Sequence, residues 1–98
     1  MPAYLLSIVE VTQITDDFKR YVAASAALLQ QFGGEYILRG KASQVYEGTA
    51  LEGKSVVLTR FADMDRLKAF YQSDEYQNNV KPLRANTGIY DIASFEAP

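Results

Sequence analysis

The chain has neither cysteine nor histidine among its 98 residues. Without cysteine it can form no disulfide, no thiolate metal site and no cysteine nucleophile, and it fits a reducing compartment. The missing histidine removes a second residue type that often carries chemistry. Few reactive side chains remain, so arginine and tyrosine become the residues of interest.

A strong charge of one sign and a long apolar run are also missing. Lysine and arginine number 10 against 12 acidic residues, so no basic surface is expected to attract nucleic acid or anionic lipid. No apolar run approaches the roughly 20 residues that cross a bilayer, and the opening MPAYLLSIVE lacks the basic segment of a signal peptide. We therefore expect a cytoplasmic protein with no nucleic-acid or membrane partner.

The amino-acid composition of the chain is typical of a single globular domain, which would cover residues 1–98. Hydrophobic residues make up 48% and charged residues 22% of the chain, and no low-complexity tract suggests disorder. The length is near the lower limit at which one core suffices, so no second domain is expected. The carboxylates are scattered, and Asp63 and Asp65 are better explained as the start of a helix than as metal ligands.

Hydrophobic periodicity predicts the order β-α-β-β-α-(short α)-β. Caps are expected at Thr15, Asp63 and Ser73, and Gly33-Gly34 should close the first helix. The predicted elements are a strand at 3–11, a helix at about 16–32, a strand at 35–39 that bulges at Gly40 and resumes to Gly48, a turn at 49–54, a strand at 55–61, a helix after Asp63, a short helix or turn after Ser73 and a strand at 88–95.

This order is that of the ferredoxin-like split βαβ fold, an α+β architecture with a four-stranded antiparallel sheet. The strands carry apolar residues at both parities, for example at Leu5 and Leu6 or at Val57 and Leu58. Two helices can cover only one face of such a sheet. A second copy packed sheet to sheet would cover the other face, so we expect a homodimer, the alternative being a monomer with an apolar surface.

Several segments together resemble the dimeric α+β-barrel proteins of domain-of-unknown-function family 1330 (DUF1330). They are AYLLSIVEV, GGEYILRG, VVLTRF, and AFYQSDEYQ followed by Arg84, and the resemblance extends from about Pro2 to Ser94. Asp74 stands where the family usually has proline, and either residue suits a first helical turn. The resemblance implies a dimeric barrel but no agreed activity, so it assigns no catalytic residue.

Wider relatives of this shape include cofactor-free monooxygenases, isomerases and haem enzymes. The haem class is not expected, because a histidine normally holds the iron and this chain has none. We therefore expect no cofactor. The expected function stays open between a cofactor-independent oxygenase or isomerase-like enzyme acting on a small organic acid or phenol, and a non-catalytic ligand-binding or structural dimer.

Arg39 is the first candidate ligand-binding residue, because a guanidinium in an apolar strand needs a carboxylate, a ligand anion or water. Glu47, or else Glu35 or Glu52, could instead satisfy it in a salt bridge within the hairpin. In the functional interpretation, Arg39 and Arg84 converge on a cleft between sheet and helices and hold a small carboxylate or enolate.

Tyr71 and Tyr76 flank the break between two helices and could bring their phenols to one cleft, with Arg84 favouring a phenolate; otherwise they are core aromatics. Asn86 and Tyr4 are weaker candidates for hydrogen bonds to an oxyanion.

Pro2 raises a third enzyme class, because tautomerases use an N-terminal proline as general base. The strand SVVLTRF does not match the aromatic, basic motif of RNA-recognition domains, and Gly33-Gly34 precedes a strand where a phosphate loop would precede a helix.

Overall fold

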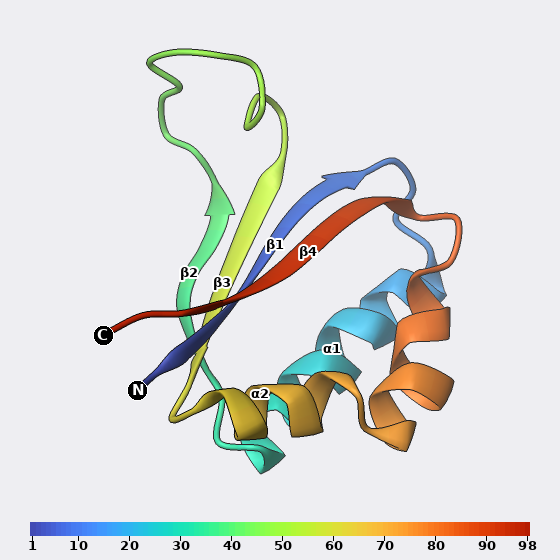
Figure 1. The fold of residues 1–98 in the computed structure, drawn as a ribbon. Helices are drawn as coiled ribbons and strands as arrows, with labels where there is room; N and C mark the ends of the chain where they lie inside the picture. The colour runs from blue at the N-terminus through green and yellow to red at the C-terminus, as the bar shows by residue number, and fades with distance from the viewer.

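The computed structural model describes all 98 residues, which form a four-stranded antiparallel sheet with the helices on one of its faces (Figure 1). The strands lie in the order β2-β3-β1-β4. The elements are β1 (Ala3–Val11), α1 (Asp16–Gln31), β2 (Glu35–Lys41), β3 (Ser55–Phe61), α2 (Met64–Tyr71), the π-helical turn η1 (Glu75–Val80), the 3₁₀ turn η2 (Lys81–Arg84) and β4 (Gly88–Glu96).

The strand order confirms the predicted split βαβ topology. Helix α1 leaves β1 and returns to β2, and β3 lies between these two strands and is antiparallel to both. Strand β4 pairs with the other edge of β1, so β1 is central. The chain therefore has an α+β, ferredoxin-like fold. None of its helices combines the length and hydrophobicity needed to cross a membrane.

The ends of the first helix follow the predicted local rules. The Thr15 hydroxyl accepts a hydrogen bond from the Phe18 amide at 2.9 Å, and two aspartates in the first turn complement the helix dipole. At the other end Gly33 adopts a left-handed conformation (φ 76°), and its amide donates to the Gln30 carbonyl at 3.0 Å. Both boundaries are therefore set by residues adjacent in the sequence.

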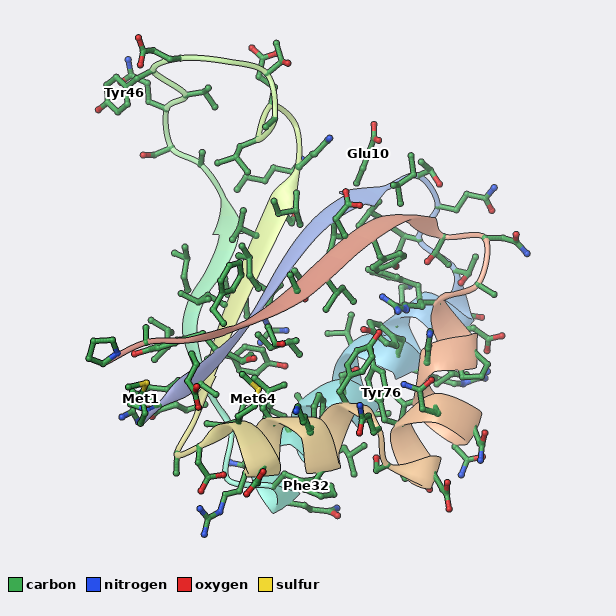
Figure 2. The ribbon with its side chains drawn as sticks, in the orientation of Figure 1. Met1, Glu10, Phe32, Tyr46, Met64 and Tyr76 are labelled. Carbon is green, nitrogen blue, oxygen red and sulfur yellow. The ribbon has the colours of Figure 1, made fainter.

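Strand β2 differs from its prediction in two ways. Tyr36 pairs with Thr59 and Leu38 with Leu58, so the extra residue of the bulge is Ile37 and not Gly40. The strand also ends at Lys41, opposite the first residue of β3, so residues 42–48 have no neighbouring strand and form a loop. The predicted extension to Gly48 is therefore wrong. Figure 2 places Tyr46 at the far end of this loop, beyond the sheet, and its side chain is 85% exposed.

Helix α2 and the two turns after it begin where the sequence predicts. The Asp63 carboxylate accepts a hydrogen bond from the Arg66 amide at 2.8 Å, and the Ser73 hydroxyl accepts one from the Tyr76 amide at 3.1 Å. Pro82 lies in the first turn of η2, where its missing N–H costs no helical hydrogen bond. These turns bury Tyr76, Val80 and Arg84.

The hydrophobic core occupies one end of the space between sheet and helices. Phe61 is fully buried and lies 5.6 Å, centroid to centroid, from Phe70 of α2, which in turn lies 5.2 Å from Tyr76. The side chains of this cluster are Ala3, Leu28, Leu29, Phe61, Leu67, Phe70, Tyr76 and Val80. The core thus joins the C-terminal half of α1 to α2 and to one end of the strands, and the N-terminal half of α1 stands over a hollow part of the sheet.

The other face of the sheet is apolar and carries no helix. Leu6 of β1 lies between Leu58 of β3 and Ala93 of β4 on this face. Leu38 and Phe95 on the same face are 55% and 50% exposed. The two-sided apolar pattern read from the sequence is therefore present in the fold.

Candidate functional site

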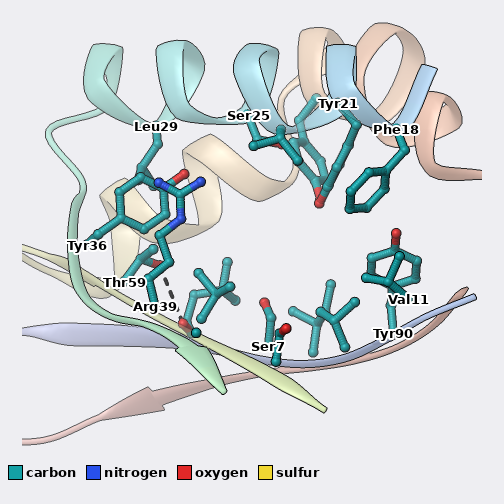
Figure 3. A pocket seen from close by; sticks show the side chains of 18 of the residues that line it. Ser7, Val11, Phe18, Tyr21, Ser25, Leu29, Tyr36, Arg39, Thr59 and Tyr90 are labelled. Carbon is teal, nitrogen blue, oxygen red and sulfur yellow. Dashed lines mark hydrogen bonds between the residues drawn. The ribbon is translucent and has the colours of Figure 1, made fainter. Parts of the chain in front are cut away.

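A cavity of about 530 Å³ lies between α1 and the sheet (Figure 3). This volume is within the range of small-molecule sites. Its floor comes from alternate residues of the strands, and its roof from residues three or four apart on α1. The lining residues are Leu5, Ser7, Val9, Val11, Phe18, Tyr21, Val22, Ser25, Leu29, Tyr36, Arg39, Gly40, Ser55, Val57, Thr59, Phe70, Tyr76, Tyr90 and Ile92.

Arg39 and Tyr36 form one end of the cavity (Figure 3). They are three positions apart and would point to opposite faces of a regular strand, but the bulge at Ile37 brings both to the helix-covered face, opposite Val57 and Thr59. The Arg39 guanidinium carbon lies 4.3 Å from the centroid of the Tyr36 ring, in cation–π contact. Burial raises the pKa of Tyr36, and the charge of Arg39 opposes this only in part.

Arg39 forms no salt bridge, so the alternative in which a hairpin carboxylate satisfies it is not observed. Glu35 pairs with Arg60 at 3.4 Å, because these two residues lie opposite each other on the other face of the sheet. Glu47 and Glu52 belong to the exposed loop after β2, where β3 no longer accompanies the chain. Arg39 therefore keeps its charge available at the solvent-exposed edge of the cavity.

Two tyrosine hydroxyls meet in the roof of the cavity. The hydroxyls of Tyr21 and Tyr76 are 3.1 Å apart, and Tyr76 is almost completely buried. Burial and then the neighbouring Tyr21 raise the pKa of Tyr76 far above the usual 10, and Arg84 opposes this shift weakly. Tyr76 is therefore a neutral hydrogen-bonding group, and the expected phenolate is not favoured. Tyr71 stacks on Tyr76 at 4.9 Å between centroids but does not line the cavity.

Tyr90 stands at the end of the cavity opposite Arg39, below Phe18 (Figure 3). Its hydroxyl is 2.7 Å from the Thr87 hydroxyl, and the Thr87 hydroxyl also donates to the Arg84 carbonyl. Because Thr87 has a single hydroxyl hydrogen, Tyr90 must be the donor in the Tyr90–Thr87 bond. The Tyr90 oxygen can then only accept a further hydrogen bond.

Arg84 lies behind this end of the cavity and does not line it. Its side chain is only 9% exposed, and its guanidinium carbon lies 4.4 Å from the centroid of the Tyr90 ring and 5.6 Å from that of Tyr21. The buried Nη1 atom has no hydrogen-bond partner, and Arg84 forms no salt bridge. Arg84 therefore adds an unbalanced positive charge next to two lining tyrosines.

The five arginines fall into two groups. Arg20, Arg60 and Arg66 each form a salt bridge with a carboxylate at the surface. Arg39 and Arg84 form none, and these are the two arginines at the cavity. Among the arginines, only the two at the cavity lack a carboxylate partner.

Among the other predicted site residues, Glu47 and Asn86 lie outside the lining of the cavity. Asn86 is exposed and occupies a left-handed backbone conformation (φ 62°) in the turn before β4, which asparagine tolerates well. Tyr4 points to the bare face of the sheet, since it pairs with Arg60 and Phe95. Pro2 is also absent from the lining.

Sequence reasoning did not single out Tyr21, Ser25, Tyr36 or Tyr90 as site residues. Tyr21 and Ser25 belong to the apolar stripe of α1, where a tyrosine and a serine are the only polar members, and this was a usable signal. Ser25 is the more informative of the two, because its hydroxyl oxygen is buried and has no hydrogen-bond partner. Nothing in the sequence indicates that the four tyrosines Tyr21, Tyr36, Tyr76 and Tyr90 share one cavity.

The chemistry of the lining is restricted. Thirteen of its 19 residues are hydrophobic, and its only charged side chain is Arg39. The cavity has no carboxylate, lysine or histidine, and no group of acidic residues in the structure is arranged to hold a metal ion. The arrangement can therefore donate hydrogen bonds and neutralise an anion inside an apolar enclosure.

Comparison with solved structures shows the same fold in proteins of low sequence identity. The RPA0582 protein of unknown function from Rhodopseudomonas palustris is 15% identical with a TM-score of 0.73, over 99% of this chain and 82% of that one. SnoaB, a cofactor-independent oxygenase from Streptomyces nogalater, is 14% identical with a TM-score of 0.67, over 99% and 93%. A candidate antibiotic biosynthesis monooxygenase from Caulobacter crescentus is 18% identical with a TM-score of 0.64, over 99% and 90%.

No curated protein matches the sequence. The model of one protein family, the domain of unknown function DUF1330, matches residues 2–97, which is almost the entire chain. The chain belongs to the DUF1330 family.

Proposed function

We propose that the cavity binds a small, mainly apolar organic acid or phenol in its anionic form. The observation that carries this proposal is Arg39, which lines an otherwise apolar cavity and has no carboxylate partner in the chain. A guanidinium at the edge of an apolar cavity can form a charge-assisted, bidentate hydrogen-bonded pair with a carboxylate, and the apolar lining can bury the body of the ligand. The ring of Tyr36 holds the guanidinium at the cavity edge.

The titratable groups that line the cavity favour a ligand that is already ionised when it binds. The lining contains no histidine, lysine or carboxylate that could accept a proton near neutral pH. Burial raises the pKa of Tyr36 and of Tyr76, so both phenols keep their protons and act as donors. The protein thus supplies donors and one cation, and the ligand supplies the negative charge.

Among enzymatic activities, cofactor-independent oxygenation of such an anion has the best support. An isomerase needs a group that removes a proton from the substrate, and the lining offers none. Oxygenation of an acid or phenol that has already ionised in solution does not need such a base. SnoaB, which has the same fold, is a cofactor-independent oxygenase, and the fold likeness makes this reaction class the first to test. The tautomerase interpretation has no support, because Pro2 does not line the cavity.

A non-catalytic binding protein is the second candidate. The same absence of a proton acceptor favours it, since binding requires only the donors and the cation that the lining contains. The two candidates differ in one measurable property, which is oxygen consumption with a bound phenol. Uptake of oxygen above the uncatalysed rate supports the oxygenase, and binding without uptake supports the binding protein.

The binding proposal is tested by calorimetry with 2-naphthoate and its neutral analogue 2-naphthamide. We expect the acid to bind and the amide to bind at least about tenfold more weakly. Arg39→Ala should remove the preference for the acid. Arg66→Ala, which removes a surface arginine paired with Asp63, is the matched control and should leave it unchanged. Equal binding of acid and amide to the unmodified protein would contradict the proposal.

For the bare face of the sheet, a second copy of the chain is the proposed cover. The face carries exposed Leu38 and Phe95, and symmetric homodimers are the most common assemblies of soluble proteins. Sheet-to-sheet packing would remove these side chains from water without involving the cavity, which lies on the opposite face.

A further inference from the structure

The cavity has a second polar end, away from Arg39, that the proposed anion does not use. This end is formed by the hydroxyls of Tyr21 and Tyr76, with Arg84 behind the rings. Figure 3 shows Tyr21 descending from α1 into the space above the sheet, toward the Tyr90 end of the cavity. Three features of this end point to a ligand group.

The first feature is a spare hydroxyl hydrogen. Tyr21 and Tyr76 share one hydrogen bond, so one of the two hydroxyl hydrogens is used between them and the other is not. Both residues line the cavity, and neither hydroxyl has another protein partner. The pair can therefore donate one hydrogen bond to an acceptor inside the cavity.

The second feature is that the neighbouring Tyr90 hydroxyl cannot donate a hydrogen bond to the ligand. Tyr90 donates its hydrogen to Thr87, because the Thr87 hydrogen is directed to the Arg84 carbonyl. This hydrogen-bond chain fixes the Tyr90 ring against the Arg84 guanidinium. Among the tyrosine hydroxyls at this end, donation to a ligand thus falls to the Tyr21–Tyr76 pair.

The third feature is the unbalanced charge of Arg84. Its side chain is nine-tenths buried, its Nη1 atom lacks a hydrogen-bond partner, and it pairs with no carboxylate. A buried guanidinium without a counter-charge makes a nearby negative or partly negative oxygen favourable. The guanidinium carbon lies 5.6 Å from the centroid of the Tyr21 ring, so this charge is close to the hydroxyl pair.

From these features we infer that the ligand is bipolar, with an anionic group at Arg39 and an acceptor oxygen, such as a carbonyl, at the Tyr21–Tyr76 pair. Between the two ends the cavity is walled by Val22, Val57 and Ile92, which suit a flat hydrocarbon body. The substrate class is then a keto- or oxygen-substituted aromatic acid. Arg84 is a positioning residue that acts through the tyrosines. This inference rests on the proposed function and adds the second recognition point.

The test compares two acids of nearly equal shape, 4-acetylbenzoate and 4-isopropylbenzoate, which differ in the acceptor oxygen. By calorimetry we expect the acetyl compound to bind about tenfold more tightly. Tyr21→Phe or Tyr76→Phe alone leaves one hydroxyl hydrogen in the pair and should keep part of this preference. The double variant leaves none and should bind the two acids equally. Arg39→Ala should weaken both acids by the same factor.

Two substitutions test whether the positive charge of Arg84 contributes to the preference for the acetyl compound. Arg84→Met should reduce the preference for the acetyl compound, and Arg84→Lys, which keeps the charge, should restore part of it. Thermal unfolding of each variant separates a change in recognition from a failure to fold, and a purely structural role would weaken both acids equally. If both acids bind the unmodified protein equally, or if the double variant keeps the preference, the inference is overturned and the proposed function stands. If neither acid binds, both fail.

Discussion

The two faces of the sheet have similar apolar residues but differ in what stands over them. On one face, α1 and α2 cover alternate residues such as Leu5 and Val57, and the cover is incomplete, so a cavity remains. On the other face, Leu6 and Leu58 have no helix above them. The alternation of a strand therefore makes two apolar surfaces, and the covered one holds the candidate site, because the helices enclose space above it and bring polar groups to it.

The strongest contrast is expected between two phenylalanines on opposite faces. Phe61 is fully buried in the core, and Phe95 on the bare face is half exposed. Phe61→Ala should lower the free energy of unfolding by about 3–5 kcal/mol, because it leaves a cavity in the core. Phe95→Ala should cost less than about 1 kcal/mol at concentrations where the chain is a single subunit. Urea unfolding measures both, and similar losses in dilute solution would contradict the contrast.

The next largest effect concerns the proposed dimer. Leu58→Lys places a charge at the centre of the bare face and should raise the dissociation constant of the dimer at least about a hundredfold. Thr49→Lys, in the exposed loop, adds the same charge away from the face and serves as control. Sedimentation at micromolar concentrations reads out the assembly. An unmodified protein that sediments as one subunit would refute the proposal.

A smaller effect is expected from filling the cavity. The Ser25 hydroxyl is buried without a hydrogen-bond partner and faces the cavity, so Ser25→Leu removes an unsatisfied polar group and occupies empty space. We expect 2-naphthoate to bind about tenfold more weakly while the melting temperature is kept or raised. Ala23→Leu, an exposed change two residues earlier on the same helix, should alter neither property. Unchanged affinity in Ser25→Leu would place the ligand elsewhere.

The smallest effect is the alkaline loss of stability on the covered face. Burial raises the pKa of Tyr36 and of Tyr76 in the folded state, whereas both titrate near 10 when unfolded. Below pH 10 both states are protonated and stability does not depend on these groups. Above pH 10 the unfolded chain loses protons that the folded chain keeps, so stability falls by up to about 1.4 kcal/mol per pH unit for each tyrosine. Tyr76→Phe should make the fall of the unfolding free energy in urea titrations at pH 9.5–11 shallower. An unaltered slope would show that Tyr76 titrates normally.

Much of the fold follows from local rules that the sequence displays. Thr15, Asp63 and Ser73 each cap the predicted segment, because a side-chain oxygen next to the first free amides satisfies them without help from distant residues. The limits of β1 and β3 were likewise predictable from alternation. The end of β2 was not, since a strand continues only while its neighbour does, and β3 begins opposite Lys41.

The site was less predictable for a similar reason. Arg39 was identified because a cation in an apolar strand is costly, and it does line the cavity without an ion pair. The contact of Tyr21 with Tyr76 joins residues 55 positions apart, and no local sequence pattern predicts it. The position of Arg84 behind Tyr21 and Tyr90 depends on the packing of η2 against α1 and β4.

By itself, the sequence determined the order of the elements, the caps of the helices and a sheet that is apolar on both sides, because each of these depends on spacing along one segment. The tertiary structure alone decided which face Arg39 occupies. One extra residue at Ile37 reverses the alternation of β2, so Arg39 joins Tyr36 on the covered face. The physical reason is that strand side chains alternate with a period of two, and whether one residue is inserted depends on pairing with β3.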